Sequence, residues 1–239
     1  MSNSDRYWFI VPAAGIGSRM NADLPKQYLK LGNQSILDTT IRKLLEFPLT
    51  KGIVLVLSPE DSYWQQSDFY QSPDIVIVSG GKDRFNSVFN ALEYLLKNTH
   101  NKQDWVLVHD AARPCIRHSD LNKIIDECQQ HQTGGILASP VHDTIKQATN
   151  RQTIDKTLDR QIIWKALTPQ MFKLEKLHQT LKKAIDNHWH VTDEASAIEL
   201  DQGEIKLIEG HDDNIKITRP QDLSLAHFYL QQQELACSE

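Results

Sequence analysis

Short apolar runs alternate along the chain with longer stretches in which apolar residues recur at a spacing of three to four. Near-continuous apolar runs are typical of parallel strands covered on both faces, and the longer spacing is typical of helices with one apolar face. This pattern predicts strands at residues 7–11, 52–57, 74–78, 105–108 and 135–138. It predicts helices at residues 36–45, 85–96 and 119–128, with Ser35 and Ser119 as N-terminal caps of the first and third.

The repeated alternation of strand and helix predicts an α/β fold. We expect a Rossmann-like, mostly parallel, twisted sheet with helices on both faces. Towards the C-terminus the pattern predicts a helix at 174–187, a short helix from Asp193, strands at 205–208 and 215–217, and a last helix opened by Pro220. Because such sheets bind ligands beyond the carboxyl ends of their strands, the loops after 7–11, 74–78 and 105–108 should share one site.

Residues 141–165 interrupt the alternation. The segment is polar, rich in Thr, Asp, Lys and Arg, and its apolar residues are too sparse to build a core. We expect an antiparallel β-arm that protrudes from the sheet and is stabilised against a second subunit, with a disordered linker as the alternative. On this view residues 1–239 form a single domain with a dimerisation arm, and the protein is a homodimer.

A loop of small residues follows the first strand and is followed in turn by two cations, Arg19 and Lys26. Glycine permits backbone angles that turn several N–H groups into one concavity, which suits a polyphosphate. The loop does not match the dinucleotide fingerprint, because Met20 stands where a third glycine is needed, and the Gly-Lys-Ser/Thr of a P-loop is absent. A β-turn flanked by solvated basic residues is the structural alternative.

Three polar residues near the predicted strand ends are further candidates. Asp110 ends a buried strand, where an aspartate either caps the loop or binds ligand hydroxyls or magnesium. Ser87 follows Gly81, where a helix cap is the structural explanation. Lys216 lies between two isoleucines, so alternation places it on the opposite face from the core, where a solvent-facing lysine is the ordinary explanation.

The composition and net charge of the chain limit the kinds of molecule that it is expected to bind. The chain has 239 residues, of which 40% are hydrophobic and 24% charged, and a net charge of −5, which gives no basis for binding nucleic acid or an anionic membrane through bulk charge. The three cysteines form no CxxC pair and are typical of reduced thiols, so we expect a cytoplasmic protein. No apolar run approaches the length of a membrane span. His188 and His190 lack a third metal ligand at suitable spacing.

Several segments together resemble one enzyme family. The stretch Pro12-Ala13-Ala14-Gly15-Ile16-Gly17-Ser18-Arg19-Met20, followed by Pro25-Lys26-Gln27, resembles the nucleotide-binding loop of nucleotidyltransferases. The similarity is greatest to the 2-C-methyl-D-erythritol 4-phosphate cytidylyltransferases of the non-mevalonate isoprenoid pathway. Later matching segments are Gly80-Gly81 with Arg84 and Ser87, residues 108–114, Asp159-Arg160, residues 192–196 and residues 213–216.

The resemblance implies a nucleotide-diphospho-sugar transferase type of fold and a reaction of CTP with 2-C-methyl-D-erythritol 4-phosphate, assisted by Mg²⁺. It implies transition-state stabilisation by Arg19 and Lys26. It also implies nucleotide binding by Pro12, Ala13, Ala14, Gly15, Gly17, Gly81, Ser87 and Asp110. Acceptor binding would fall to Thr144, Arg160, Thr192, Lys216 and Asp110, with Arg160 reaching the site of a second subunit.

Two other functions remain open at this point. A related nucleotidyltransferase would use a sugar phosphate or a pentitol phosphate as the acceptor. A non-catalytic nucleotide-binding protein on the same fold would not need both loop cations and Lys216, and their presence speaks against it. No direct protein ligand of a metal ion can be assigned from the sequence.

Overall fold

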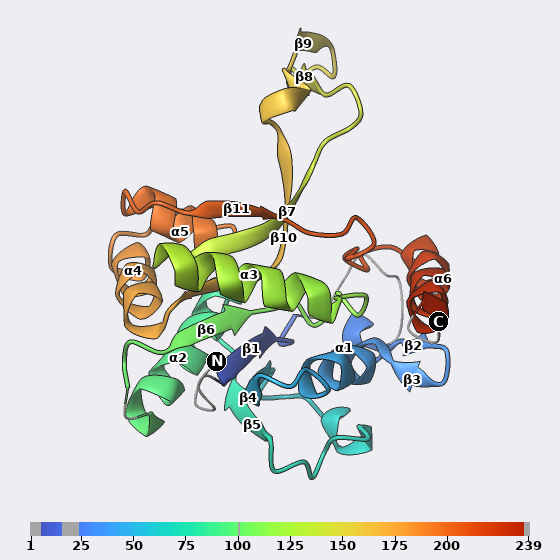
Figure 1. Cartoon of the computed structure of the whole chain (residues 1–239), viewed down its shortest axis with the longest axis vertical. Coiled ribbons are helices and arrows are strands. Elements are labelled where there is room, and N and C mark those ends of the chain that lie inside the picture. Colours follow the sequence, from blue (N-terminus) through green and yellow to red (C-terminus); the bar gives the residue numbers. More distant parts are fainter. Residues whose placement is uncertain (1–5, 16–23, 100, 237–239) are drawn as a thin grey trace.

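The computed structural model describes residues 6–15, 24–99 and 101–236. Its centre is a seven-stranded sheet in the order β11-β7-β10-β6-β1-β4-β5 (Figure 1). The strands are β1 (Tyr7–Pro12), β4 (Thr50–Leu57), β5 (Ile75–Ser79), β6 (Trp105–Val108), β7 (Gly135–Pro140), β10 (Trp164–Lys173) and β11 (Lys206–Glu209). Only β10 is antiparallel to its neighbours among these strands, so the prediction of a mostly parallel sheet is confirmed.

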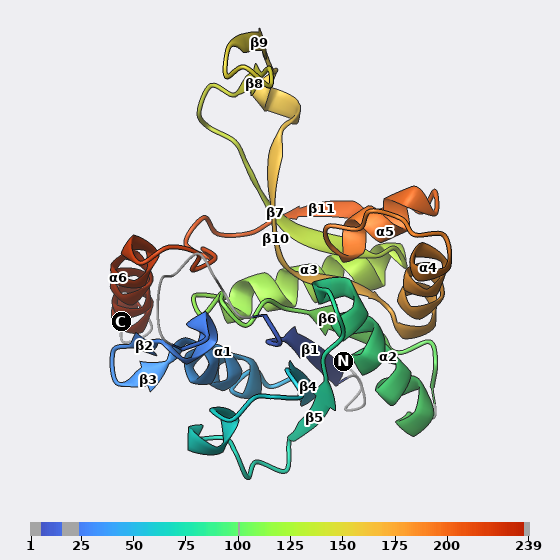
Figure 2. The same ribbon diagram turned by 180° about the vertical axis from the view of Figure 1, so that it is seen from behind.

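Helices cover both faces of the sheet, as the alternation predicts (Figures 1 and 2). On one face α1 (Ile36–Leu45) and α3 (His118–His131) pack against side chains such as Phe9 and Leu55. On the other face α2 (Arg84–Asn98), α4 (Leu174–Asp186) and α5 (Glu194–Leu200) pack against the alternate residues, such as Ile10 and Val54. Neighbouring positions of one strand thus serve two separate cores, which explains why these strands are apolar throughout.

A third, smaller core lies beside the main sheet. It joins α6 (Gln221–Ala236) to the short hairpin of β2 (Lys30–Leu31) and β3 (Gln34–Ser35), with Ile217 buried between them. The hairpin precedes α1, and α6 follows the segment that carries Lys216. This core therefore ties the C-terminal segment to the region just after the first loop.

The arm extends away from the body of the molecule in both views (Figures 1 and 2). It contains a hairpin of β8 (Lys146–Ala148) and β9 (Ile154–Thr157), and the chain returns through β10. Ile154 and Ile162 are 67% and 75% exposed on it. The segment is thus an antiparallel arm and not an unstructured linker, whereas its role in dimerisation stays a prediction.

Three local predictions were wrong or incomplete. Residues 215–217 form no strand, because Ile217 makes a single backbone hydrogen bond to the Ala112 carbonyl at 2.9 Å. Ser119 is not a cap, since α3 begins at His118 after Arg117, without a side-chain cap. Ser35 does cap α1, and accepts a hydrogen bond from the Asp38 N–H at 2.9 Å. Strand β10 was not predicted at all.

No helix in the described part of the chain is long and apolar enough to cross a membrane.

Candidate active site

A cavity of about 200 Å³ lies at the carboxyl ends of β1, β5 and β6. The loop after β1 contributes residues 12–15, the loop after β5 contributes residues 81–84 and the loop after β6 contributes residues 110–112. Lys26 and Lys216 complete its wall. The three loops that the sequence assigns to one site therefore do converge on a single cavity.

The loop after β1 is tied down by main-chain contacts on both sides. The Ala13 N–H donates to the Val56 carbonyl at 2.8 Å, and the buried Gln27 amide donates to the Ala13 carbonyl at 2.7 Å. Gln27 lies in a short 3-10 helix that begins at Lys26, so its hydrogen bond also places Lys26 at the cavity. The Lys26 ammonium donates to the Ile217 carbonyl at 3.4 Å, beside Lys216 in the chain. Gly17 and Arg19 lie outside the described residues.

Ser87 shapes the loop after β5. Its hydroxyl accepts a hydrogen bond from the Gly81 N–H at 3.1 Å and donates to the Asp83 carbonyl at 3.2 Å. Ser87 is not the helix cap, because that position belongs to Asp83. A side chain at Gly81 would place its Cβ 2.5 Å from the Asn86 Cβ, so the loop has room only for glycine there. Ser87 lines the cavity, and its recognition of a base stays a prediction.

Asp110 is the electrostatic centre of the site, with a side chain only 9% exposed. Its Oδ2 lies 2.8 Å from the Lys216 Nζ and 3.6 Å from the Arg113 Nε. Its Oδ1 accepts from the Arg84 Nε at 3.1 Å. Burial by itself would raise the pKa of Asp110, but the three cations outweigh it and hold that pKa well below its usual range. Asp110 is therefore an anion throughout the neutral range.

Arg84 bridges Asp110 to a second carboxylate, Glu194. Its Nη1 lies 2.6 Å from the Glu194 Oε1 and its Nη2 lies 3.2 Å from Oε2. Burial opposes the charge of Arg84, yet Glu194 and Asp110 raise its pKa above the usual value. In the sequence, Arg84 and Glu194 stand out only as members of the segments that match the family, without a role of their own. Their contacts span 26 and 110 positions, so no local pattern could reveal them.

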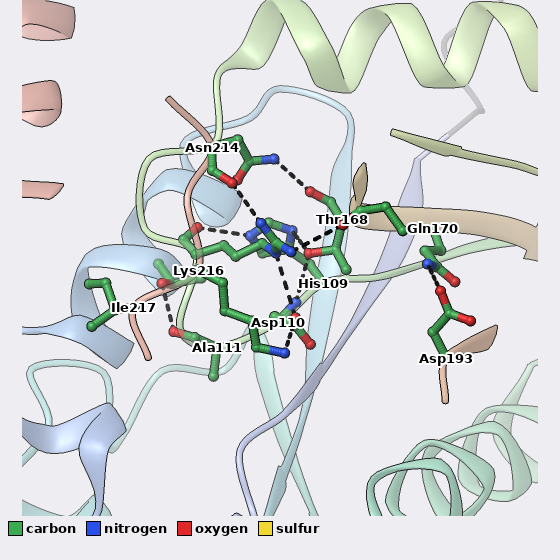
Figure 3. Close-up of polar contacts among 12 residues, drawn as sticks. His109, Asp110, Ala111, Thr168, Gln170, Asp193, Asn214, Lys216 and Ile217 are labelled. Atoms are coloured by element: carbon green, nitrogen blue, oxygen red, sulfur yellow. Dashed lines mark hydrogen bonds and ion pairs between the residues drawn. The ribbon is translucent and has the colours of Figure 1, made fainter. Parts of the chain in front are cut away.

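Strand β10 fixes the backbone of Asp110 through the side chain of Thr168 (Figure 3). The Thr168 hydroxyl accepts from the Asp110 N–H at 3.1 Å and lies 3.0 Å from the His109 Nδ1. The His109 Nε2 lies 3.0 Å from the Arg113 carbonyl, which can only accept, so Nε2 carries the proton and Thr168 donates to Nδ1. Burial lowers the pKa of His109 to about 4, so the ring is neutral at pH 7. Asn214 donates to the Thr168 carbonyl at 2.7 Å and completes this support.

The residues predicted to bind the acceptor do not all meet at this cavity. Asp110 and Lys216 line it, whereas Thr192 lines a neighbouring cavity of about 510 Å³ on the far side of Arg84. Thr144 and Arg160 are exposed on the arm, outside both cavities, and the Arg160 Nη1 donates to the His142 carbonyl at 2.7 Å. A single subunit therefore brings together only part of the predicted set.

The donor set at the cavity fits a magnesium ion carried by a substrate better than a resident metal. No group of three or more metal-binding side chains occurs among the residues that the structure describes. Two acidic residues, Asp83 and Asp110, are among those that line the cavity. Mg²⁺ commonly binds through one or two carboxylates together with substrate phosphates and water, so these residues suit it once phosphates are present.

The chain is an α/β protein whose sheet is covered on both faces. Its cavity at the carboxyl ends of the strands, with a loop of small residues and several cations, suits an anionic, nucleotide-like ligand. Residues 8–232 match the family model of 2-C-methyl-D-erythritol 4-phosphate cytidylyltransferase, and the chain belongs to this family.

Relatives of that name support the assignment. The one from Aliivibrio fischeri strain MJ11 is 51% identical over 222 residues, which cover 93% of this chain and 92% of the relative. The one from Vibrio vulnificus strain CMCP6 is 50% identical and covers 94% of both chains. The crystal structure of the Francisella tularensis enzyme of the same name superposes with a TM-score of 0.82 at 38% identity, and covers 94% of this chain and 99% of that one.

Proposed function

We propose that this protein transfers the cytidylyl group of CTP to the phosphate of 2-C-methyl-D-erythritol 4-phosphate, with release of pyrophosphate. The product is 4-diphosphocytidyl-2-C-methyl-D-erythritol, a precursor in the non-mevalonate isoprenoid pathway. The observation that carries the proposal is the convergence of Lys26, Lys216 and the Arg84–Asp110 pair on the loop that follows β1. Family membership supplies the identity of the two substrates.

The reaction needs charge neutralisation more than it needs a nucleophilic side chain. A phosphate oxygen of the acceptor attacks the α-phosphorus of CTP, and the bond from that phosphorus to the oxygen of the departing pyrophosphate breaks. Both reactants are anions, so fixed cations lower the barrier by offsetting their repulsion. Lys26 lines the cavity beside the loop after β1, and we propose that Lys26 and Arg19 bind the triphosphate. Mg²⁺ bound with the phosphates of CTP would supply further positive charge.

Asp110 has an orienting role in this proposal and not that of a general base. The acceptor phosphate is already ionised at neutral pH, so no proton has to be removed from it. Asp110, held ionised by its three partners, is also a poor base because its pKa is depressed. Its contact with Lys216 fixes the ammonium at the cavity wall, where that ammonium can orient the acceptor phosphate.

We also propose a cytoplasmic homodimer in which each arm serves the other subunit's site. Thr144 and Arg160 are remote from the cavity of their own subunit, and the arm exposes Ile154 and Ile162. Pairing with a second subunit would cover those apolar side chains and place Arg160 opposite an anionic acceptor.

A pyrophosphate-release assay tests the function. The purified protein is supplied with each of the four ribonucleoside triphosphates, 2-C-methyl-D-erythritol 4-phosphate and Mg²⁺. We expect release with CTP, strong preference over UTP, and loss of release when EDTA removes the metal. Preference for a pentitol phosphate or a sugar 1-phosphate in the same assay would assign the chain to another acceptor. Absence of release with every acceptor would overturn the enzymatic function.

A further inference from the structure

Glu194 is a fully buried carboxylate that the proposed chemistry does not use. It is the first residue of α5 and has 0% exposure. Removing a carboxylate from water is unfavourable unless a cation and hydrogen bonds compensate for it. Its buried position therefore requires a partner, and the described partner is Arg84.

The contact between Glu194 and Arg84 fixes the direction in which the guanidinium points. Both Glu194 oxygens bind the Nη1/Nη2 edge of Arg84, at 2.6 and 3.2 Å. The other edge, Nε and Nη2, faces the Asp110 Oδ1 at 3.1 Å from each nitrogen. A guanidinium is planar and rigid, so holding one edge orients the other. Glu194 thus determines how Arg84 meets Asp110.

This arrangement divides the two oxygens of Asp110 between different cations. Oδ1 is occupied by Arg84, and Oδ2 lies 2.8 Å from the Lys216 Nζ. Without Glu194, Arg84 would have Asp110 as its only carboxylate partner in the cluster. A bidentate pairing of Arg84 with Asp110 would then use both oxygens and compete with Lys216 for Oδ2.

We propose that Glu194 is a positioning residue for the transfer reaction, which holds Arg84 on Oδ1 of Asp110 and so keeps Oδ2 for Lys216. The inference rests on the proposed function of Lys216 in orienting the acceptor. It predicts an effect on turnover, because Glu194 binds Arg84 and acts through Asp110 on Lys216, the residue proposed to orient the acceptor.

The test compares Glu194→Gln, Arg84→Gln and the double variant with the wild type. Glu194→Gln should lower kcat for pyrophosphate release about 10–100-fold, the scale of a misplaced reacting group. CTP affinity, measured calorimetrically without acceptor, should stay within about threefold of wild type, a shift small beside that in kcat. If Glu194 acts through Arg84, the double variant should be no slower than the slower single variant.

Asp201→Asn is the matched control for a purely structural role. Asp201 follows the other end of α5 and anchors it to Lys176 and Lys183 of α4, both at 2.8 Å. This substitution also changes a carboxylate to an amide, at the residue that follows α5, but Asp201 makes no described contact with Arg84. We expect normal kcat in this control, with thermal unfolding measured for every variant.

Two outcomes would overturn the inference. One is a loss of kcat in the double variant equal to the product of the losses in Glu194→Gln and Arg84→Gln. The other is a loss of CTP affinity as large as the loss of kcat. If Glu194→Gln does not fold, two further variants keep the test open. The double variant removes both charges of the pair, and Glu194→Asp keeps the negative charge on a shorter side chain. The double variant should then be as slow as Arg84→Gln, and Glu194→Asp should be intermediate. An inactive wild type would overturn the proposed function. If the wild type is active and the kcat losses of the two single variants multiply in the double variant, only the role of Glu194 is overturned.

Discussion

Replacing Asp110 with asparagine removes one negative charge from a cluster that holds three cations and preserves the shape of the side chain. Arg113 is 10% exposed and Arg84 is 28% exposed, so these two partners cannot regain full hydration. Breaking a buried ion pair typically costs 3–5 kcal/mol. Here the cost should be near the lower limit, about 3 kcal/mol, because Arg84 keeps Glu194 and Arg113 keeps the Asn214 carbonyl.

For a chain of this size each kcal/mol shifts Tm by about 2–4 °C, so Asp110→Asn should lower Tm by about 6–12 °C at pH 7. Lys216→Gln is the comparison, because it breaks a pair whose lysine is 38% exposed. Pairs in contact with solvent contribute about 0–1 kcal/mol, so its Tm should fall by less than about 4 °C. Thermal unfolding followed by circular dichroism measures both variants.

The effect of Asp110→Asn on stability should also depend on pH. The folded-state pKa of Asp110 is depressed, so its contribution to stability is present above the unfolded pKa of about 3.9 and is lost as pH falls through the folded value. The Tm difference between wild type and Asp110→Asn should therefore be constant above about pH 5 and shrink below about pH 4. A shift at pH 7 smaller than about 2 °C would refute the view that these cations depend on Asp110.

Four other predictions concern activity. Lys26→Ala, and likewise Arg19→Ala, should lower kcat about 10²–10³-fold with little change in CTP affinity. Steady-state kinetics measures kcat and calorimetry measures the affinity; a raised KM with normal kcat would mean that these residues bind only the ground state. Lys216→Gln should weaken use of the acceptor and leave CTP binding intact; lost CTP binding contradicts this. Arg160→Ala mixed with Lys26→Ala should regain activity up to about a quarter of wild type after subunit exchange, since one hybrid site is intact; no recovery after verified exchange places Arg160 elsewhere. Gly81→Ala should impair CTP binding because the new Cβ would meet Asn86 at 2.5 Å; unchanged affinity refutes this.

Patterns of apolar residues predicted the parallel strands and the helices that cover them, because each such element is determined by neighbours a few positions away. Strand β10 escaped prediction because Pro169 interrupts it and Thr168 and Gln170 are polar. In the structure, the pairing register between β10 and β7 shifts between Ala166 and Gln170, which accommodates the proline. The two polar side chains are buried because they bind His109, Asp110 and the start of α5.

The pattern of the sequence predicted those parts of the candidate site that lie at the carboxyl ends of predicted strands. The loop after β1, Gly81 and Asp110 each end a predicted strand, and their meeting follows from the geometry of a parallel sheet. The pairing of Arg84 with Glu194 depends on how α2 and α5 pack on the same face of the sheet. That packing is a property of the folded chain, and no spacing in the sequence encodes it.

The antiparallel strand in the middle of the sheet has a consequence for how the protein is made. Strands β1, β4, β5 and β6 form a continuous block within residues 7–108, and β7 and β11 join it only through the pairing of β10 with β6. On a ribosome, residues 7–108 emerge first and include the loops after β1 and β5. Thr168 and Glu194, which contact Asp110 and Arg84, and Lys216, which lines the cavity, are synthesised later. Until β10 is made, β6 is an open edge of this block.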